Sequence, residues 1–301
     1  STLGSAVSIT TKGDVSTSGA DSEGIEGLSK YGAVIIASTG DIVTGGVDSE
    51  GIYGHTGTKG GTVTITSTGD VKTTANTSAA IYGHTVYTNA GVTITAHGDL
   101  STAGTSSNGI FGRTEEKDSD VTITSSGTIA VAGTYSIGIG ALSLEVDSDI
   151  EITSASAITA TGKDGAAIRA STVENDSGLT IISTGKLKVT DGVGIFAQTD
   201  GNDADVAVGS YADIIVGGDK SGGIAGPTDG TGSSPTVVST GDITATGYAV
   251  SGIRASTFAG TSQIHISSSG DITTSGDQGY GIRAKGTDAL IEVTASGAIS
   301  T

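Results

Sequence analysis

Reactive and bulky side chains are scarce in this chain of 301 residues, which contains no Cys, Met or Trp. Without cysteine the chain forms no disulfide and offers no thiolate for a metal, so cysteine usage does not fix its redox compartment. Such a chain is suited to export, because no premature disulfide can block its passage across a membrane. Aromatic residues make up 4% and hydrophobic residues 35%, less than a conventional globular core uses.

Positive charge and long apolar runs are also in short supply. The chain has 14 Lys and Arg against 32 Asp and Glu, which gives a formal net charge of −18. This balance disfavours nucleic acid and anionic lipid as partners. No apolar run approaches the ~20 residues of a membrane-spanning helix, so we expect no membrane insertion of this segment.

Glycine is abundant, at 50 residues, and it belongs to a repeat that runs through the whole chain. Low hydrophobicity with high net charge is typical of disorder, but a disordered chain has no reason to hold aliphatic residues at fixed spacing. A Gly-Asp-aliphatic turn, in which other residues replace Asp in some repeats, recurs every 27 or 29 residues. We therefore expect one domain covering residues 1–301. The aliphatic markers are Val15, Ile42, Val71, Leu100, Ile129, Ile158, Leu187, Ile214, Ile243, Ile272 and Ile299.

Each repeat contains three pieces with the character of short strands. The first alternates aliphatic residues with Thr or Ser, as in residues 121–124, and this places the aliphatics on one face. The second contains the marker, and the third contains an Ile preceded by Gly or Ala. Three strands in about 29 residues predict an all-β fold, a right-handed parallel β-helix (β-solenoid) of ten or more coils. The third-strand residues are Ile25, Ile52, Ile81, Ile110, Ile139, Ile168, Ile195, Ile224, Ile253 and Ile282.

A column of aspartates follows the glycine of the marker turn. Carboxylates stacked at the spacing of strands should repel one another. We interpret them as turn residues whose side chains hydrogen-bond the backbone, as Asp commonly does. The column contains Asp14, Asp41, Asp70, Asp99, Asp213, Asp242 and Asp271.

The outward residues of the third strand offer a candidate binding surface. Tyr53, Tyr82 and Phe111 each follow a third-strand Ile and should form an exposed aromatic ladder. Two residues further along the same strands are His55, His84 and Arg113. Aromatic rings beside basic and polar groups are typical of a glycan or protein contact. The alternative is that the rings simply stack and shield the hydrogen bonds beneath them.

The loops after the third strand are acidic in the middle repeats. Asp200, Asn202, Asp203 and Asp205 supply oxygen ligands at short spacing, as a calcium-binding loop does, so calcium is the one candidate cofactor. The alternative is a solvated acidic ridge that keeps the rod soluble and blocks sideways pairing.

The tandem pattern Val-Thr-Ile-Thr, Ser-x-Gly-Asp-Ile and Gly-Ile-x-Gly/Ala resembles the repetitive passenger regions of bacterial autotransporters (type V secretion). The resemblance covers residues 1–301. It implies a passenger that is extracellular or displayed on the bacterial outer-membrane surface after export through a C-terminal barrel of its precursor. Many such passengers are adhesins, so the implied partner is a glycan or protein of a host or neighbouring cell.

Three classes of function remain for such a rod. The first is a non-enzymatic secreted or cell-surface adhesin or display scaffold. The second is a structural subunit of an extracellular filament, because exposed coil ends are templates for end-to-end self-association. The third, a carbohydrate-active enzyme, is disfavoured because the loops are short and no Ser-His-Asp spacing stands out.

Overall fold

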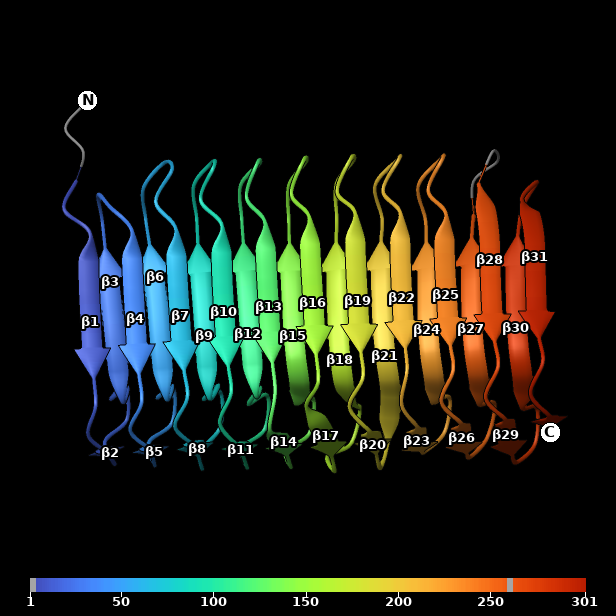
Figure 1. Ribbon diagram of the computed structural model, residues 1–301, viewed down its shortest axis with the longest axis horizontal. Coiled ribbons are helices and arrows are strands. Elements are labelled where there is room, and N and C mark those ends of the chain that lie inside the picture. The colour runs from blue at the N-terminus through green and yellow to red at the C-terminus, as the bar shows by residue number, and fades with distance from the viewer. Residues whose placement is uncertain (1–3, 259–261) are drawn as a thin grey trace.

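The computed structural model describes residues 4–258 and 262–301 and is a rod built from three parallel β-sheets (Figure 1). Each strand pairs with its equivalent one coil away, as Val92 pairs with Val121. The two termini lie at opposite ends of the rod. The predicted parallel β-helix with three strands per coil is therefore confirmed. The described part of the chain contains no helix long and apolar enough to cross a membrane.

The first and second sheets each contain eleven strands. The first sheet consists of β1 (Val7–Thr11), β4 (Val34–Ser38), β7 (Val63–Ser67), β10 (Val92–Ala96), β13 (Val121–Ser125), β16 (Ile150–Ser154), β19 (Leu179–Ser183), β22 (Val206–Ser210), β25 (Pro235–Ser239), β28 (Gln263–Ser268) and β31 (Leu290–Ala295). The second consists of the shorter β2 (Val15–Thr17), β5 (Ile42–Thr44), β8 (Val71–Thr73), β11 (Leu100–Thr102), β14 (Thr128–Val131), β17 (Ala157–Ala160), β20 (Leu187–Val189), β23 (Ile214–Gly217), β26 (Ile243–Thr246), β29 (Ile272–Ser275) and β32 (Ile299–Ser300).

The third sheet contains ten strands and carries the candidate site on its outer face. Its first four strands have five residues each, and from β15 onward they lengthen to seven or eight. It consists of β3 (Ile25–Ser29), β6 (Ile52–Thr56), β9 (Ile81–Thr85), β12 (Ile110–Thr114), β15 (Ile137–Ser143), β18 (Gly165–Thr172), β21 (Gly192–Thr199), β24 (Gly222–Thr228), β27 (Ser251–Thr257) and β30 (Tyr280–Gly286).

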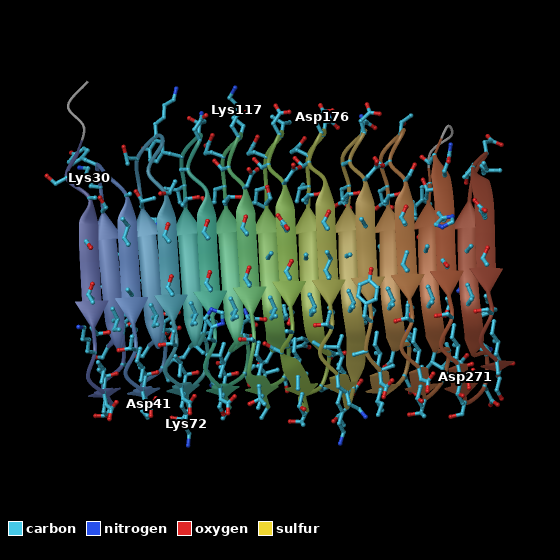
Figure 2. All side chains as sticks on the ribbon, in the orientation of Figure 1. Lys30, Asp41, Lys72, Lys117, Asp176 and Asp271 are labelled. Atoms are coloured by element: carbon cyan, nitrogen blue, oxygen red, sulfur yellow. The ribbon has the colours of Figure 1, made fainter. Side chains whose placement is uncertain are left out.

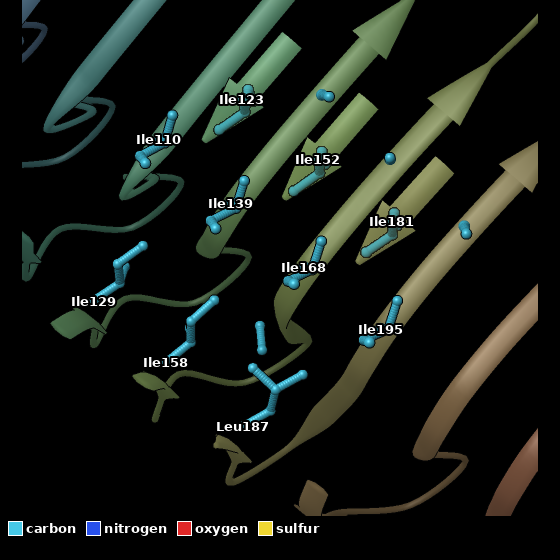
Figure 3. Close-up of a cluster of buried hydrophobic side chains, with 14 of the residues drawn as sticks. Ile110, Ile123, Ile129, Ile139, Ile152, Ile158, Ile168, Ile181, Leu187 and Ile195 are labelled. Atoms are coloured by element: carbon cyan, nitrogen blue, oxygen red, sulfur yellow. The ribbon is translucent and has the colours of Figure 1, made fainter. Parts of the chain in front are cut away.

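The core is a set of stacked aliphatic columns, one or two from each sheet. Figure 3 shows Ile123 of the first sheet, Ile129 of the second and Ile110 of the third pointing into the rod, each beside its equivalents in neighbouring coils. All three are at most 1% exposed. A single coil cannot bury these side chains alone, so the stability of the rod depends on contacts between neighbouring coils.

Glycine before the third-strand Ile makes room for the β-branched marker of the next coil. A Cβ added to Gly109 would lie 2.6 Å from Cγ2 of Ile129. Ala replaces this Gly only at Ala80 and Ala167, and there the marker of the next coil is Leu100 or Leu187. Leu carries no methyl group on its Cβ, so the space near the backbone is free for Ala. The choice between Gly and Ala is therefore coupled to the branching of the residue packed against it.

The aspartate column forms hydrogen bonds between coils. The backbone N–H of Asp70 donates to Oδ1 of Asp41 at 2.9 Å, and the backbone N–H of Asp99 donates to Oδ1 of Asp70 at 2.9 Å. The prediction that these side chains bond the backbone is confirmed, with the bonded backbone belonging to the next coil. Figure 2 shows Asp41 and Asp271 of this column along the same edge of the rod, where both residues are exposed.

Candidate functional site

Three aromatic rings lie side by side on the outer face of the third sheet, on β6, β9 and β12. Because the coils there differ by 29 residues, Tyr53 is in register with Tyr82, and Tyr82 with Phe111. The ring centroids are 5.3 Å apart for Tyr53 and Tyr82, and 5.6 Å apart for Tyr82 and Phe111. We call Tyr53, Tyr82 and Phe111, together with His55, His84 and Arg113, the aromatic strip.

The two histidines of the strip add a second row of rings. His55 and His84 lie 5.0 Å apart between centroids, and His84 stacks on Tyr82 at 5.7 Å and 9°. The structure thus brings together all six residues predicted from the sequence. The prediction that the ladder is exposed overestimated its exposure, because all six side chains are half-buried. Rings in successive coils cover one another, and each Tyr of the pair also leans on the His of its own strand.

The strip ends at Gly140, the residue of β15 that is in register with Phe111. A Cβ at this glycine would lie 2.5 Å from Cδ2 of Phe111, so the phenyl ring covers the glycine backbone. At the other end, a shallow pocket of 210 Å³ lies between Leu28 and His55. Leu28 is 50% exposed and extends the apolar surface toward the first coil.

Glu115, in the loop after β12, organises the polar edge of the strip. Its Oε1 accepts a hydrogen bond from Nε2 of His84 at 3.0 Å and an ion-paired bond from the Arg113 guanidinium at 3.0 Å. Glu115 belongs to the acidic loops that follow the third strand, and the sequence reasoning did not include it in the strip. Its position two residues after Arg113 was a usable signal for this contact. Two polar atoms of the strip, Nδ1 of His55 and Nε of Arg113, are buried without a partner among the described residues.

Burial shifts the pKa values of the histidines and tyrosines in the strip. It lowers the pKa of His55 and of His84, against the opposing effect of Glu115 on both, so both rings lose their proton more readily than a free histidine. Burial also raises the pKa of Tyr53 to about 12, with smaller contributions from Tyr82 and nearby glutamates. Burial raises the pKa of Tyr82 as well. Tyr53 and Tyr82 therefore keep their hydroxyl protons at neutral pH and can donate hydrogen bonds.

A glutamate beside the strip also titrates unusually. Burial, reinforced by the charges of Glu23, Asp48 and Glu26, raises the pKa of Glu50 to about 7, against a lowering hydrogen bond from its own backbone. Like charges and desolvation both favour the neutral acid. The strip is therefore flanked by a carboxyl that changes charge near neutral pH.

The proposed calcium ligands have other hydrogen-bonding partners. Oδ1 of Asn202 accepts the backbone N–H of Thr231 at 2.8 Å, and Oδ1 of Asp205 accepts that of Ser234 at 2.7 Å. These bonds continue the coil-to-coil pattern of the aspartate column. Asp203 occupies a turn with φ of 52°, and Oδ1 of Asp200 accepts from Gln198 at 2.6 Å. Within the ranges 4–258 and 262–301 no three His, Asp or Glu side chains are grouped to hold a metal ion, and calcium binding stays a prediction.

A row of half-buried rings with donors and acceptors along its edge can bind a ligand by stacking and hydrogen bonding. Sugar rings and extended peptide segments both present an apolar face and polar edges of this kind. No protein-family model, curated protein or solved structure matches the chain. The classification therefore rests on the architecture: the chain is a parallel β-solenoid of ten three-stranded coils with an eleventh, partial coil.

Proposed function

We propose that the chain is a non-enzymatic secreted or cell-surface β-solenoid that acts as an adhesin, in the manner of an autotransporter passenger. The carrying observation is the aromatic strip, in which half-buried rings lie beside the Arg113–Glu115 ion pair. Such a surface offers rigid aromatic area at a low entropic cost of binding, with fixed polar groups at its edge. The partner is a glycan or a protein on a host or neighbouring cell.

The extracellular location is supported by the cysteine-free composition and by the repeat pattern. The acidic loops and turns give the rod a surface that resists sideways association, since like charges keep neighbouring rods apart. Protease shaving of intact source cells tests the location: release of the chain supports surface display, and full protection refutes it.

The experiment on the strip is a glycan array combined with binding to host-cell surfaces. Tyr53→Ala with Tyr82→Ala should weaken binding about tenfold or more, because each buried aromatic anchor contributes on the order of 1–2 kcal/mol. The matched control is Tyr211→Ala with Tyr248→Ala, since these tyrosines are 50% and 44% exposed and lie away from the strip. If binding is unchanged in the Tyr53→Ala, Tyr82→Ala variant, or falls equally in the control variant, the strip is not the binding surface.

End-to-end assembly into a filament is the second candidate. Its supporting observation is the exposure of Ile291, Val293 and Ile299, the inward-type residues of the last coil, at 43 to 47%. A further coil stacked there, from this chain or a second copy, would cover these residues and pair the open strand edge. Negative-stain images at high protein concentration distinguish the two functions, because an adhesin should stay as separate short rods.

A further inference from the structure

All four arginines of the chain lie on the outer face of the third sheet. They are Arg113, Arg169, Arg254 and Arg283, and the last three occupy one column, directly after the inward Ile of β18, β27 and β30. In a chain with more than twice as many acidic as basic residues, the gathering of every arginine on one face points to a specific role there.

Three of these arginines have no acidic partner in the part of the chain that the structure describes. Arg113 pairs with Glu115, but no carboxylate within the described ranges comes within salt-bridge distance of Arg169, Arg254 or Arg283. Arg254 and Arg283 are also directly opposite each other in the register of β27 and β30. Like charges opposite one another on adjacent strands are destabilising. A bound anion would relieve this repulsion.

Small residues in β24 hollow the surface beside this pair. At the position that carries Arg or an aromatic ring in neighbouring coils, β24 has the buried Ala225. The result is a pocket of 240 Å³ lined by Arg254, Arg283 and Lys220, with Ala225 and Gly222 as its floor. Three cations therefore surround a cavity of monosaccharide size.

A second pocket of 320 Å³ adjoins the first and shares Lys220 and Val193 with it. Its lining differs in character, because it combines the rings of Phe196 and Tyr135 with three aspartates and only one further cation, Arg169. The Arg169 guanidinium lies 5.2 Å from the centroid of the Phe196 ring. The aspartates of this pocket are Asp164, Asp191 and Asp219.

We propose that the two pockets bind an oligosaccharide in which an acidic sugar is next to a neutral one. The carboxylate is held between Arg254 and Arg283, where planar guanidinium groups match its two oxygens, with Lys220 adding charge. The neutral sugar packs against Phe196 and donates its hydroxyl protons to the aspartates. A uniformly charged polyanion fits less well, because the same aspartates would repel its next charge.

This site is separate from the aromatic strip, which occupies β6, β9 and β12, and so it goes beyond the function proposed above. The test uses isothermal titration calorimetry with a tetrasaccharide of alternating glucuronic acid and N-acetylglucosamine. Chitotetraose serves as the neutral probe and inorganic phosphate as the simple anion. We expect binding of the acidic tetrasaccharide, and little or none of the other two.

The key variant is Arg254→Gln with Arg283→Gln, which should weaken binding of the acidic tetrasaccharide about tenfold or more. Both arginines are exposed, so the fold should be retained, and a circular-dichroism melting curve with a Tm no lower than that of the wild type verifies this. Lys72→Gln with Lys188→Gln removes two exposed charges from the second sheet and should change the affinity by less than about twofold.

Two further variants separate the parts of the site. Arg254→Lys keeps the positive charge but removes the planar guanidinium group that can bind both carboxylate oxygens, so it should give intermediate affinity. Phe196→Ala should weaken binding of the tetrasaccharide and leave binding of free glucuronate unchanged.

The proposal is overturned if the arginine double variant binds the tetrasaccharide as the wild type does, if chitotetraose binds equally well, or if phosphate alone binds as tightly as the tetrasaccharide. The strip variants at Tyr53 and Tyr82 should leave this binding intact, so the two proposals fail independently.

Discussion

At the scale of single residues, the environment of a side chain on this rod is set by its neighbours 27 or 29 residues away in the sequence. Glu50 shows this most clearly, because the carboxylates that raise its pKa include Glu23 and Glu26 of the preceding coil. Glu115 is a second case, since it reaches back across a coil to His84. Charge effects on the third sheet therefore follow the stacking direction.

The shift of Glu50 predicts a pH-dependent stability. Its pKa is raised from 4.5 to about 7, so the folded state favours the protonated acid, and this contribution is lost as the pH rises from 4.5 through 7. Glu50→Gln mimics the neutral acid. It should raise the Tm above pH 7 and leave it unchanged near pH 4.

Thermal melts monitored by circular dichroism at pH 4 and pH 8 provide the measurement. Glu174→Gln, in an exposed loop, is the matched control and should show no gain at pH 8 relative to pH 4. A Glu50→Gln effect of equal size at both pH values would contradict the assigned titration, because it would reflect packing and not charge.

At the scale of elements, each strand is short and is held by its in-register neighbours. In the third sheet Gly or Ala precedes each inward Ile, and this small residue leaves room for the marker side chain of the second sheet. The coupling of Gly to a β-branched marker, and of Ala to Leu, is a local rule that the coils share.

This rule predicts the outcome of a double-mutant cycle at Leu100 and Ala80. Leu100→Ile adds a methyl group on Cβ where Ala80 already fills the space, so it should cost about 1–3 kcal/mol. Ala80→Gly alone should cost about 1 kcal/mol through backbone entropy and lost packing. The double variant should be more stable than Leu100→Ile alone, since it recreates the Gly109–Ile129 arrangement.

The cycle is measured by denaturant unfolding of the four proteins, and the coupling energy is the quantity of interest. Ile129→Leu opposite Gly109 is the reverse control and introduces no clash. Strictly additive effects of the two substitutions would contradict the proposed steric coupling.

At the scale of the whole molecule, the rod is a linear stack in which each coil contacts only the coils beside it. Ten rises of ~4.8 Å give a rod on the order of 50 Å long. Its stability is then close to a sum of coil and interface terms, and length changes by whole coils preserve every pairing.

Deletion of residues 121–149 removes β13, β14 and β15 together and joins equivalent positions, so the variant should fold and melt cooperatively at a somewhat lower Tm. Deletion of residues 121–132 removes fewer residues but takes away only β13 and β14, leaving β15 without its coil. The shorter deletion should be the more damaging one. Circular dichroism and gel filtration check this. A well-folded variant lacking residues 121–132 would contradict the view that the whole coil is the unit of the structure.

The sequence by itself determined the solenoid, because coils of 27 or 29 residues stack equivalent positions and the aliphatic period identifies the inward face. It also determined the six strip residues, which register alone brings together. Only the tertiary structure showed that Glu115 joins the strip and that the rings are half-buried. It alone showed that Arg254 and Arg283 face a pocket and have no acidic partner among the residues described. These features depend on loop paths and side-chain directions between coils, which a repeat pattern does not encode, whereas strand register follows from the spacing alone.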